Sequence, residues 1–172
     1  YIKEILLLLD QIMEELKQIE HPNIFIGGGT TQEEVGTRGA KTLGYLSNAD
    51  IGFSIDVGIA DDMHGQAKEG IVLGKGPVIN CNTDCHREMV NIAKTVSKST
   101  NLNIQLNANP ISTGGTNTAS LQVSNKGVKT LLLSIPNRYM HTQVEMCDLR
   151  DVESAIELIV ETILFINTNK LL

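Results

Sequence analysis

The chain has 172 residues, a mass of 18.7 kDa and a formal net charge of −6. This length suits one domain, and 41% hydrophobic residues exclude intrinsic disorder as the overall state. The acidic balance and the 3% aromatic content argue against nucleic-acid binding, and no apolar run in the sequence approaches the ~20 residues that span a bilayer.

The first half of the chain predicts one helix and then strands and a loop. Apolar residues spaced by three and four indicate a helix over residues 2–19. Residues 23–26 are typical of a short strand, and a second strand is expected over 50–60. The glycine-rich stretch 61–76 is predicted to be a loop, and the apolar residues that follow it lie at 77–79.

The second half alternates helices and strands. We expect helices over 86–99 and 119–125, strands over 102–106 and 128–135, a loop over 112–118, and a last helix that begins at Asp148 or Asp151. This alternation predicts an α/β fold, a three-layer αβα sandwich with a mostly parallel central sheet. Residues 1–172 are expected to form a single domain segment, without an internal repeat or a linker.

The number of cysteines indicates the redox state of the cellular compartment in which the protein folds. Three cysteines, Cys81, Cys85 and Cys147, cannot all pair within one chain, and no signal peptide is visible. We therefore expect reduced thiols and a cytoplasmic protein. The chain begins at Tyr1, almost inside the first predicted helix, so it has either been cut or is preceded by further residues.

Polar side chains follow three of the predicted strands closely. Glu33 and Glu34 follow the first, Asp56 closes the second, and His141 follows the strand TLLLSIP. Ligands of open α/β sheets bind beyond the carboxyl ends of strands, so these groups would converge on one edge. Carboxylates with an imidazole suit a zinc or cobalt site with one carboxylate spare as a base.

Each residue also has a simpler interpretation. A Glu-Glu pair in a loop is usually solvated surface, an Asp at a strand end is often a turn residue, and a single His is often a hydrogen-bonded filler. The sequence Cys81-x3-Cys85-His86 lacks the second half of a structural zinc site, so buried thiols at a helix start explain it better.

Five stretches, in this order, resemble the glutamyl aminopeptidase family, also known as the tetrahedral (TET) aminopeptidases. They are TQEEVG at 31–36 with RGA after it, SIDV at 54–57, LGKGP at 73–77, GGT at 114–116 and IPNRYMH at 135–141. The resemblance runs from about residue 24 to the C-terminus. It implies a cytosolic two-metal peptidase that acts on peptides and assembles into homo-oligomers, without nucleic-acid or membrane partners.

The resemblance also implies roles for individual residues. Glu33 would be the general base, which takes a proton from the attacking water and passes it to the departing amine. Glu34 and His141 would bind one divalent ion, zinc or cobalt, and Asp56 the other. Residues expected to line the substrate cleft are Arg138, Gly114, Gly115 and Thr116.

The sequence departs from the family pattern in several places. A histidine and a metal-bridging aspartate should lie before the first helix, and the family's inserted small β-domain is also absent. We therefore expect these 172 residues alone to be inactive. Asn117 stands where the family usually has Asp, and His64 replaces a proline.

A metallo-aminopeptidase is thus the leading functional hypothesis. Two alternatives stay open: a related two-metal amide hydrolase, such as a deacylase or carboxypeptidase, and a non-catalytic peptide-binding or assembly protein.

Overall fold

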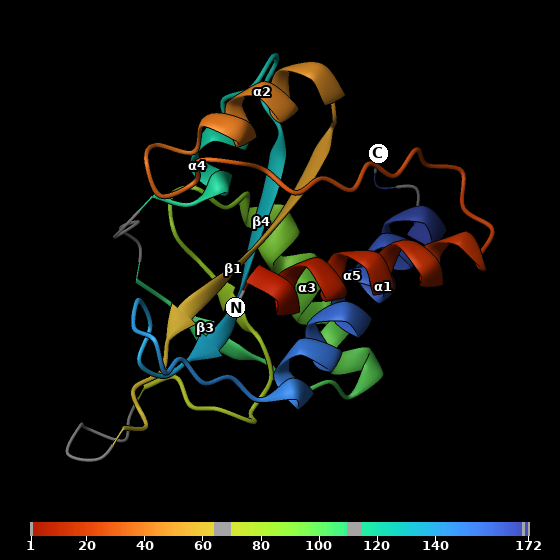
Figure 1. The fold of residues 1–172 in the computed structure, drawn as a ribbon. Helices are drawn as coiled ribbons and strands as arrows, with labels where there is room; N and C mark the ends of the chain where they lie inside the picture. Colours follow the sequence, from red (N-terminus) through yellow and green to blue (C-terminus); the bar gives the residue numbers. More distant parts are fainter. Residues whose placement is uncertain (1, 64–69, 110–114, 170, 172) are drawn as a thin grey trace.

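The structure is a computed structural model that describes residues 2–63, 70–109, 115–169 and 171, with side chains from residue 7 onward. Helices and strands alternate along most of this part of the chain (Figure 1). In chain order they are α1 (Ile2–Lys17), α2 (Arg38–Ser47), β1 (Ile51–Ile59), β2 (Val78–Asn80), α3 (Arg87–Thr100), β3 (Gln105–Asn107), α4 (Asn117–Leu121), β4 (Lys129–Asn137) and α5 (Leu149–Asn169).

The sheet that these described strands form has the order β1-β4-β2-β3. β1 and β4 run parallel over their full lengths, with Ile51 opposite Lys129 and Ile59 opposite Asn137. β2 is parallel to β3 and antiparallel to β4. Two of the three pairings are therefore parallel, which confirms the predicted, mostly parallel sheet. β1 lies at one edge and β4 in the interior, where eight of its nine residues are buried.

Helices flank the sheet in two groups. α1 and α3 pack against α5, and both α3 and α5 contact β4. α2 instead packs against α4, which contacts β1 and β4 (Figure 1). The core faces the first group: Leu131, Leu133 and Ile135 alternate along β4 and meet apolar side chains of the three long helices. This arrangement confirms the predicted αβα sandwich.

The apolar faces of the helices explain where this core lies. In α1, Leu8, Ile12 and Leu16 repeat every four residues and are almost completely buried. α5 contributes buried residues on both sides of its axis, including Ala155, Leu158 and Ile159. No helix within the described residues is both long enough and apolar enough to cross a membrane.

The sequence-based prediction is wrong at three places. Residues 23–26 form an irregular segment instead of a strand, and neither α2 nor the short strand β2 was expected. Ile24 in this segment is 91% exposed, whereas Phe25 packs against the core. A cavity separates the segment from the edge strand β1, so its backbone cannot join the sheet there.

Cys81, Cys85 and Cys147 are half-buried, and Cys81 and Cys85 are free thiols, as expected for reduced cysteines. Burial raises the pKa of the Cys85 thiol, which favours an unreactive, packed role.

Candidate functional site

Glu33 and Glu34 lie in a tight turn that leads into α2. The carbonyl oxygen of Glu33 accepts hydrogen bonds from the amides of Gly36 (3.0 Å) and Thr37 (2.8 Å). Gln32 adopts a left-handed conformation with φ of 59°, which reverses the chain before the two glutamates. The carbonyls of Gln32 and Thr31 accept the amides of Arg38 and Gly39, so the turn provides acceptors for the first amides of α2, which have none within the helix.

Both ends of this turn are tied to α4. Nδ2 of Asn117 donates a hydrogen bond to Oγ1 of Thr30 at 3.0 Å. On the other side, the hydroxyls of Thr37 and Ser120 lie 2.5 Å apart and share a hydrogen bond. The side-chain amide of Asn117 therefore has a positioning contact at the place where the resemblance led us to expect a carboxylate. α4 fixes the turn that carries Glu33.

Asp56 lies on β1, near its carboxyl end. It is opposite Ser134 of β4 in the register, and its Oδ1 accepts a hydrogen bond from the Val57 amide at 2.8 Å. Its strand neighbours Ile55 and Val57 pack against the core. Because successive side chains of a strand point to opposite faces, Asp56 lies on the sheet face turned away from that core.

His141 lies in the loop that follows β4. Its Nδ1 is 3.8 Å from Oε1 of Glu34, and both side chains are mostly exposed. The loop is sharply bent, since Tyr139 and His141 both adopt left-handed conformations with φ of 58° and 63°. The amide of His141 also donates to Oε1 of Glu145 at 2.6 Å.

The charges of Asp56, Glu34 and His141 influence the pKa of Glu33. Burial raises its pKa above 4.5, and the negative charges of Asp56 and Glu34 raise it further, while His141 lowers it. All three neighbours thus act on one carboxyl group. The structure brings Glu33, Glu34, Asp56 and His141 together, although the two glutamates lie in the turn before α2 and do not follow a strand.

These donors match a divalent transition metal in kind. Two donors that each lie ~2.0 Å from a tetrahedral zinc ion are about 3.3 Å apart, and the 3.8 Å between Glu34 and His141 is close to that separation. However, no three acidic, histidine or cysteine side chains of the described residues already surround one point. Further ligands would have to complete the coordination.

A cavity of about 1110 Å³ opens beside these carboxylates. Glu33, Glu34 and Asp56 line it, together with the irregular segment, β1 and α2. Apolar side chains of α5, such as Ile159 and Ile163, also contribute to the lining. The cavity therefore places carboxylates beside an apolar surface.

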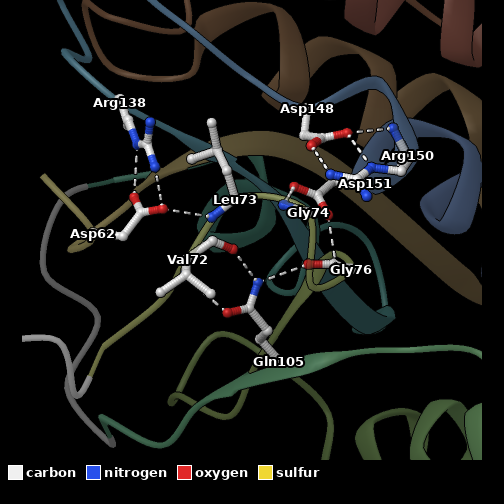
Figure 2. A network of polar contacts seen from close by, with 10 residues as sticks. All are labelled: Asp62, Val72, Leu73, Gly74, Gly76, Gln105, Arg138, Asp148, Arg150 and Asp151. Carbon is white, nitrogen blue, oxygen red and sulfur yellow. Dashed lines mark hydrogen bonds and ion pairs between the residues drawn. The ribbon is translucent and has the colours of Figure 1, made fainter.

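The residues expected at a substrate cleft are more scattered. Arg138 is engaged by the carboxylate of Asp62 (Figure 2). Gly115 is exposed, and Oγ1 of Thr116 is buried and has no hydrogen-bond partner among the described residues. Gly114 and His64 lie outside the described residues.

Sequence reasoning missed the roles of three polar residues, Asp62, Gln105 and Asp151, in the network of polar contacts that includes Arg138 (Figure 2). Asp151 was considered only as a possible helix cap. It is instead completely buried and accepts hydrogen bonds from the amides of Gly74 and Gly76. Asp148, directly before α5, accepts a hydrogen bond from the Arg150 amide at the start of that helix. An acidic pair directly after β1 was the available signal for Asp62.

The fold and the site together define an αβα protein whose carboxylates and imidazole gather at strand ends. The sequence profile of the family described as M42 glutamyl aminopeptidase matches residues 5–158. The chain therefore belongs to the M42 glutamyl aminopeptidase family.

Individual relatives agree with this assignment. The lysyl aminopeptidase of Pyrococcus furiosus is 34% identical over 148 residues, which cover 86% of this chain and 42% of that protein. The crystal structure of a TET aminopeptidase from a marine sediment Thaumarchaeota archaeon has a TM-score of 0.83 and 31% identity, covering 91% of this chain and 45% of that one. The TET1 peptidase of Pyrococcus horikoshii has a TM-score of 0.58 and 29% identity, covering 77% and 38%. The chain thus spans less than half the length of these relatives.

Proposed function

We propose that the complete protein is a metal-dependent aminopeptidase, which hydrolyses N-terminal residues from peptides. The observation that carries the proposal is the position of the Glu33 carboxyl group, partly buried and close enough to Asp56, Glu34 and His141 for all three to shift its pKa. Membership of the M42 family and the similarity to a lysyl aminopeptidase support it.

Glu33 is the proposed general base. A base works best when its pKa lies nearer the working pH than that of an ordinary carboxylate, and burial together with two acidic neighbours raises the pKa of Glu33. Its carboxylate would accept the proton of the attacking water and then donate it to the departing amine. The contacts of Thr30 with Asn117 and of Thr37 with Ser120 would hold the carboxylate in place during this transfer.

Three residues are proposed to hold two divalent ions, zinc or cobalt. Glu34 and His141 would bind one ion and Asp56 the other, and ligands outside these three would complete both sites. Bound ions of this kind polarise a scissile carbonyl and acidify water. Arg138, Gly115 and Thr116 stay predictions as substrate-binding residues.

Substrate comparison tests the proposed reaction class. The complete protein is purified, supplied with zinc or cobalt and offered a peptide with a free α-amine, and in parallel the same peptide with an acetylated N-terminus. An aminopeptidase cleaves the first and not the second, and a chelator abolishes the cleavage. Preference for the acetylated compound would indicate a deacylase, and metal-independent cleavage would contradict the proposal.

We also propose a cytoplasmic homo-oligomer. The TET1 peptidase of Pyrococcus horikoshii can assemble into a tetrahedron or a large octahedral shell, and free cysteines are typical of a reducing compartment. Light scattering coupled to size-exclusion chromatography tests the assembly, and a monomeric mass would contradict it.

A further inference from the structure

Asp62 joins the segments that leave β1 and β4. Nε of Arg138 donates to Oδ1 of Asp62 at 2.8 Å, and Nη2 of Arg138 donates to Oδ2 (Figure 2). Both partners are mostly shielded from solvent, with 17% of the Asp62 side chain and 30% of the Arg138 side chain exposed. A two-pronged contact of this type fixes orientation as well as distance.

The Asp62 carboxylate is itself held by a second segment. Oδ2 of Asp62 also accepts the amide of Leu73 at 3.2 Å. Gln105 of β3 donates from Nε2 to the carbonyls of Val72 (2.8 Å) and Gly76 (2.9 Å), on either side of Leu73. The residues that orient Asp62 are therefore anchored to the sheet independently of Arg138.

Arg138 stands at the base of the loop that carries His141. The backbones of Arg138 and Met146 exchange two hydrogen bonds, of 2.9 and 3.1 Å, which close the loop. Inside the loop, Tyr139 and His141 occupy left-handed conformations that non-glycine residues rarely adopt. Such a conformation persists only where the surrounding contacts fix it, so the position of His141 depends on how the loop base is held.

We propose that Asp62 and Arg138 are positioning residues, whose ion pair fixes the base of the His141 loop against the exit of β1 and so sets the distance between His141 and Glu34. This inference rests on the proposed metal-dependent function. It assigns Arg138 an indirect role, in which Arg138 positions His141, because two of its guanidinium nitrogens already donate to Asp62.

Zinc affinity tests this proposal without any measurement of activity. The dissociation constant for Zn²⁺ is measured by competition with a chromogenic chelator for the wild type, Arg138→Lys, Asp62→Asn and the double variant. Arg150→Lys is the matched control, since Arg150 makes the same two-pronged contact with Asp148 but lies outside the His141 loop. Circular dichroism and metal-free unfolding temperatures show whether each variant folds.

Loss of a residue that orients a metal ligand typically weakens metal binding 10- to 100-fold. We expect a loss of that size for Arg138→Lys and for Asp62→Asn, no further loss in the double variant, and a change of less than about twofold for the control. Unchanged zinc affinity in either folded variant would overturn the proposal. Should Arg138→Lys fail to fold, Asp62→Asn alone decides, because it keeps the size of the side chain.

A His141→Ala variant separates this proposal from the function on which it rests. If His141→Ala weakens zinc binding while Arg138→Lys and Asp62→Asn do not, the positioning role is wrong and the metal site stands. If His141→Ala leaves zinc affinity unchanged, the metal site itself is wrong, and with it the proposed pair.

Discussion

Nδ1 of His141 lies 3.8 Å from Oε1 of Glu34, although Glu34 precedes β1 and His141 follows β4. The parallel pairing of β1 with β4 places His141 at the same end of the sheet as Asp56, near the carboxyl end of β1. Glu34 reaches this end from the turn that precedes α2. This is the arrangement in which open α/β sheets gather their ligands. The two side chains are mostly exposed, so they are accessible to an ion from solution.

The first prediction concerns this pair. His141→Ala should lower zinc occupancy of the purified protein, because it removes the imidazole donor beside Glu34. The metal content of dialysed samples, measured by plasma mass spectrometry, checks it. His86→Ala is the matched control, since His86 precedes α3, on another part of the surface. Equal zinc content in the wild type and both variants would contradict the assignment.

A second prediction follows from the pKa of Asp62. The hydrogen bond from Arg138 holds this pKa below its usual 3.8. The ion pair therefore stabilises the fold fully at pH values above the unfolded-state pKa, and this contribution is lost as the pH falls through the folded-state pKa. In urea unfolding, Asp62→Asn should be less stable than the wild type near neutral pH, and the two should converge as the pH falls below the lowered folded-state pKa of Asp62. A constant difference across this range would be inconsistent with it.

The buried carboxylate of Asp151 yields a third prediction. Oδ2 accepts the Gly74 amide at 2.8 Å and Oδ1 accepts the Gly76 amide at 2.7 Å. Asp151→Asn turns one acceptor into a donor, which leaves a buried amide without a partner and should lower the free energy of unfolding by about 1–3 kcal/mol. Glu153→Gln, on the exposed side of α5, should change it little. Equal unfolding free energies for the two variants would rule out this role of Asp151.

The fourth prediction concerns Gly39, in the first turn of α2. A Cβ atom there would lie 2.6 Å from the backbone nitrogen and 2.7 Å from the oxygen of Thr31. Glycine-to-alanine exchange within a helix usually stabilises by roughly 0.5–1 kcal/mol, but Gly39→Ala should destabilise, because the turn that carries Glu33 must move. The Cβ of Gly115→Ala would meet no atom of the described part of the chain within 4 Å, so this variant is the control for the unfolding measurement. A stabilised Gly39→Ala protein would show that the turn adapts freely.

The sequence pattern predicted the elements whose own residues determine their structure. α1, α3 and α5 bury apolar side chains at helical spacing, and the apolar run Leu131–Leu133 lies in the buried strand β4. The pattern failed for residues 23–26 because a strand needs a neighbouring backbone, and here the cavity separates this segment from β1. It also failed for α2, whose helix is short and whose face toward α4 includes glycine and alanine.

The site could be predicted in part. The proximity of Asp56 and His141 could be predicted because parallel strands bring their carboxyl ends to one edge. Glu33 and Glu34 lie close to them through the turn before α2, not through the strand predicted over 23–26. The contacts of Asp62, Gln105 and Asp151 could not be predicted, since each reaches a loop residue far away in the sequence. Spacing along the chain carries no information about such pairs.

The most direct test of the central claim is Glu33→Gln. Glutamine keeps the size of the side chain but cannot accept the proton, so hydrolysis of a free α-amine peptide should fall by about 10²- to 10⁴-fold. Metal content should stay near that of the wild type, because Glu33 is the proposed base and not a ligand. This result would support a base-assisted, metal-dependent aminopeptidase. A Glu33→Gln protein that keeps most of its activity would contradict the account.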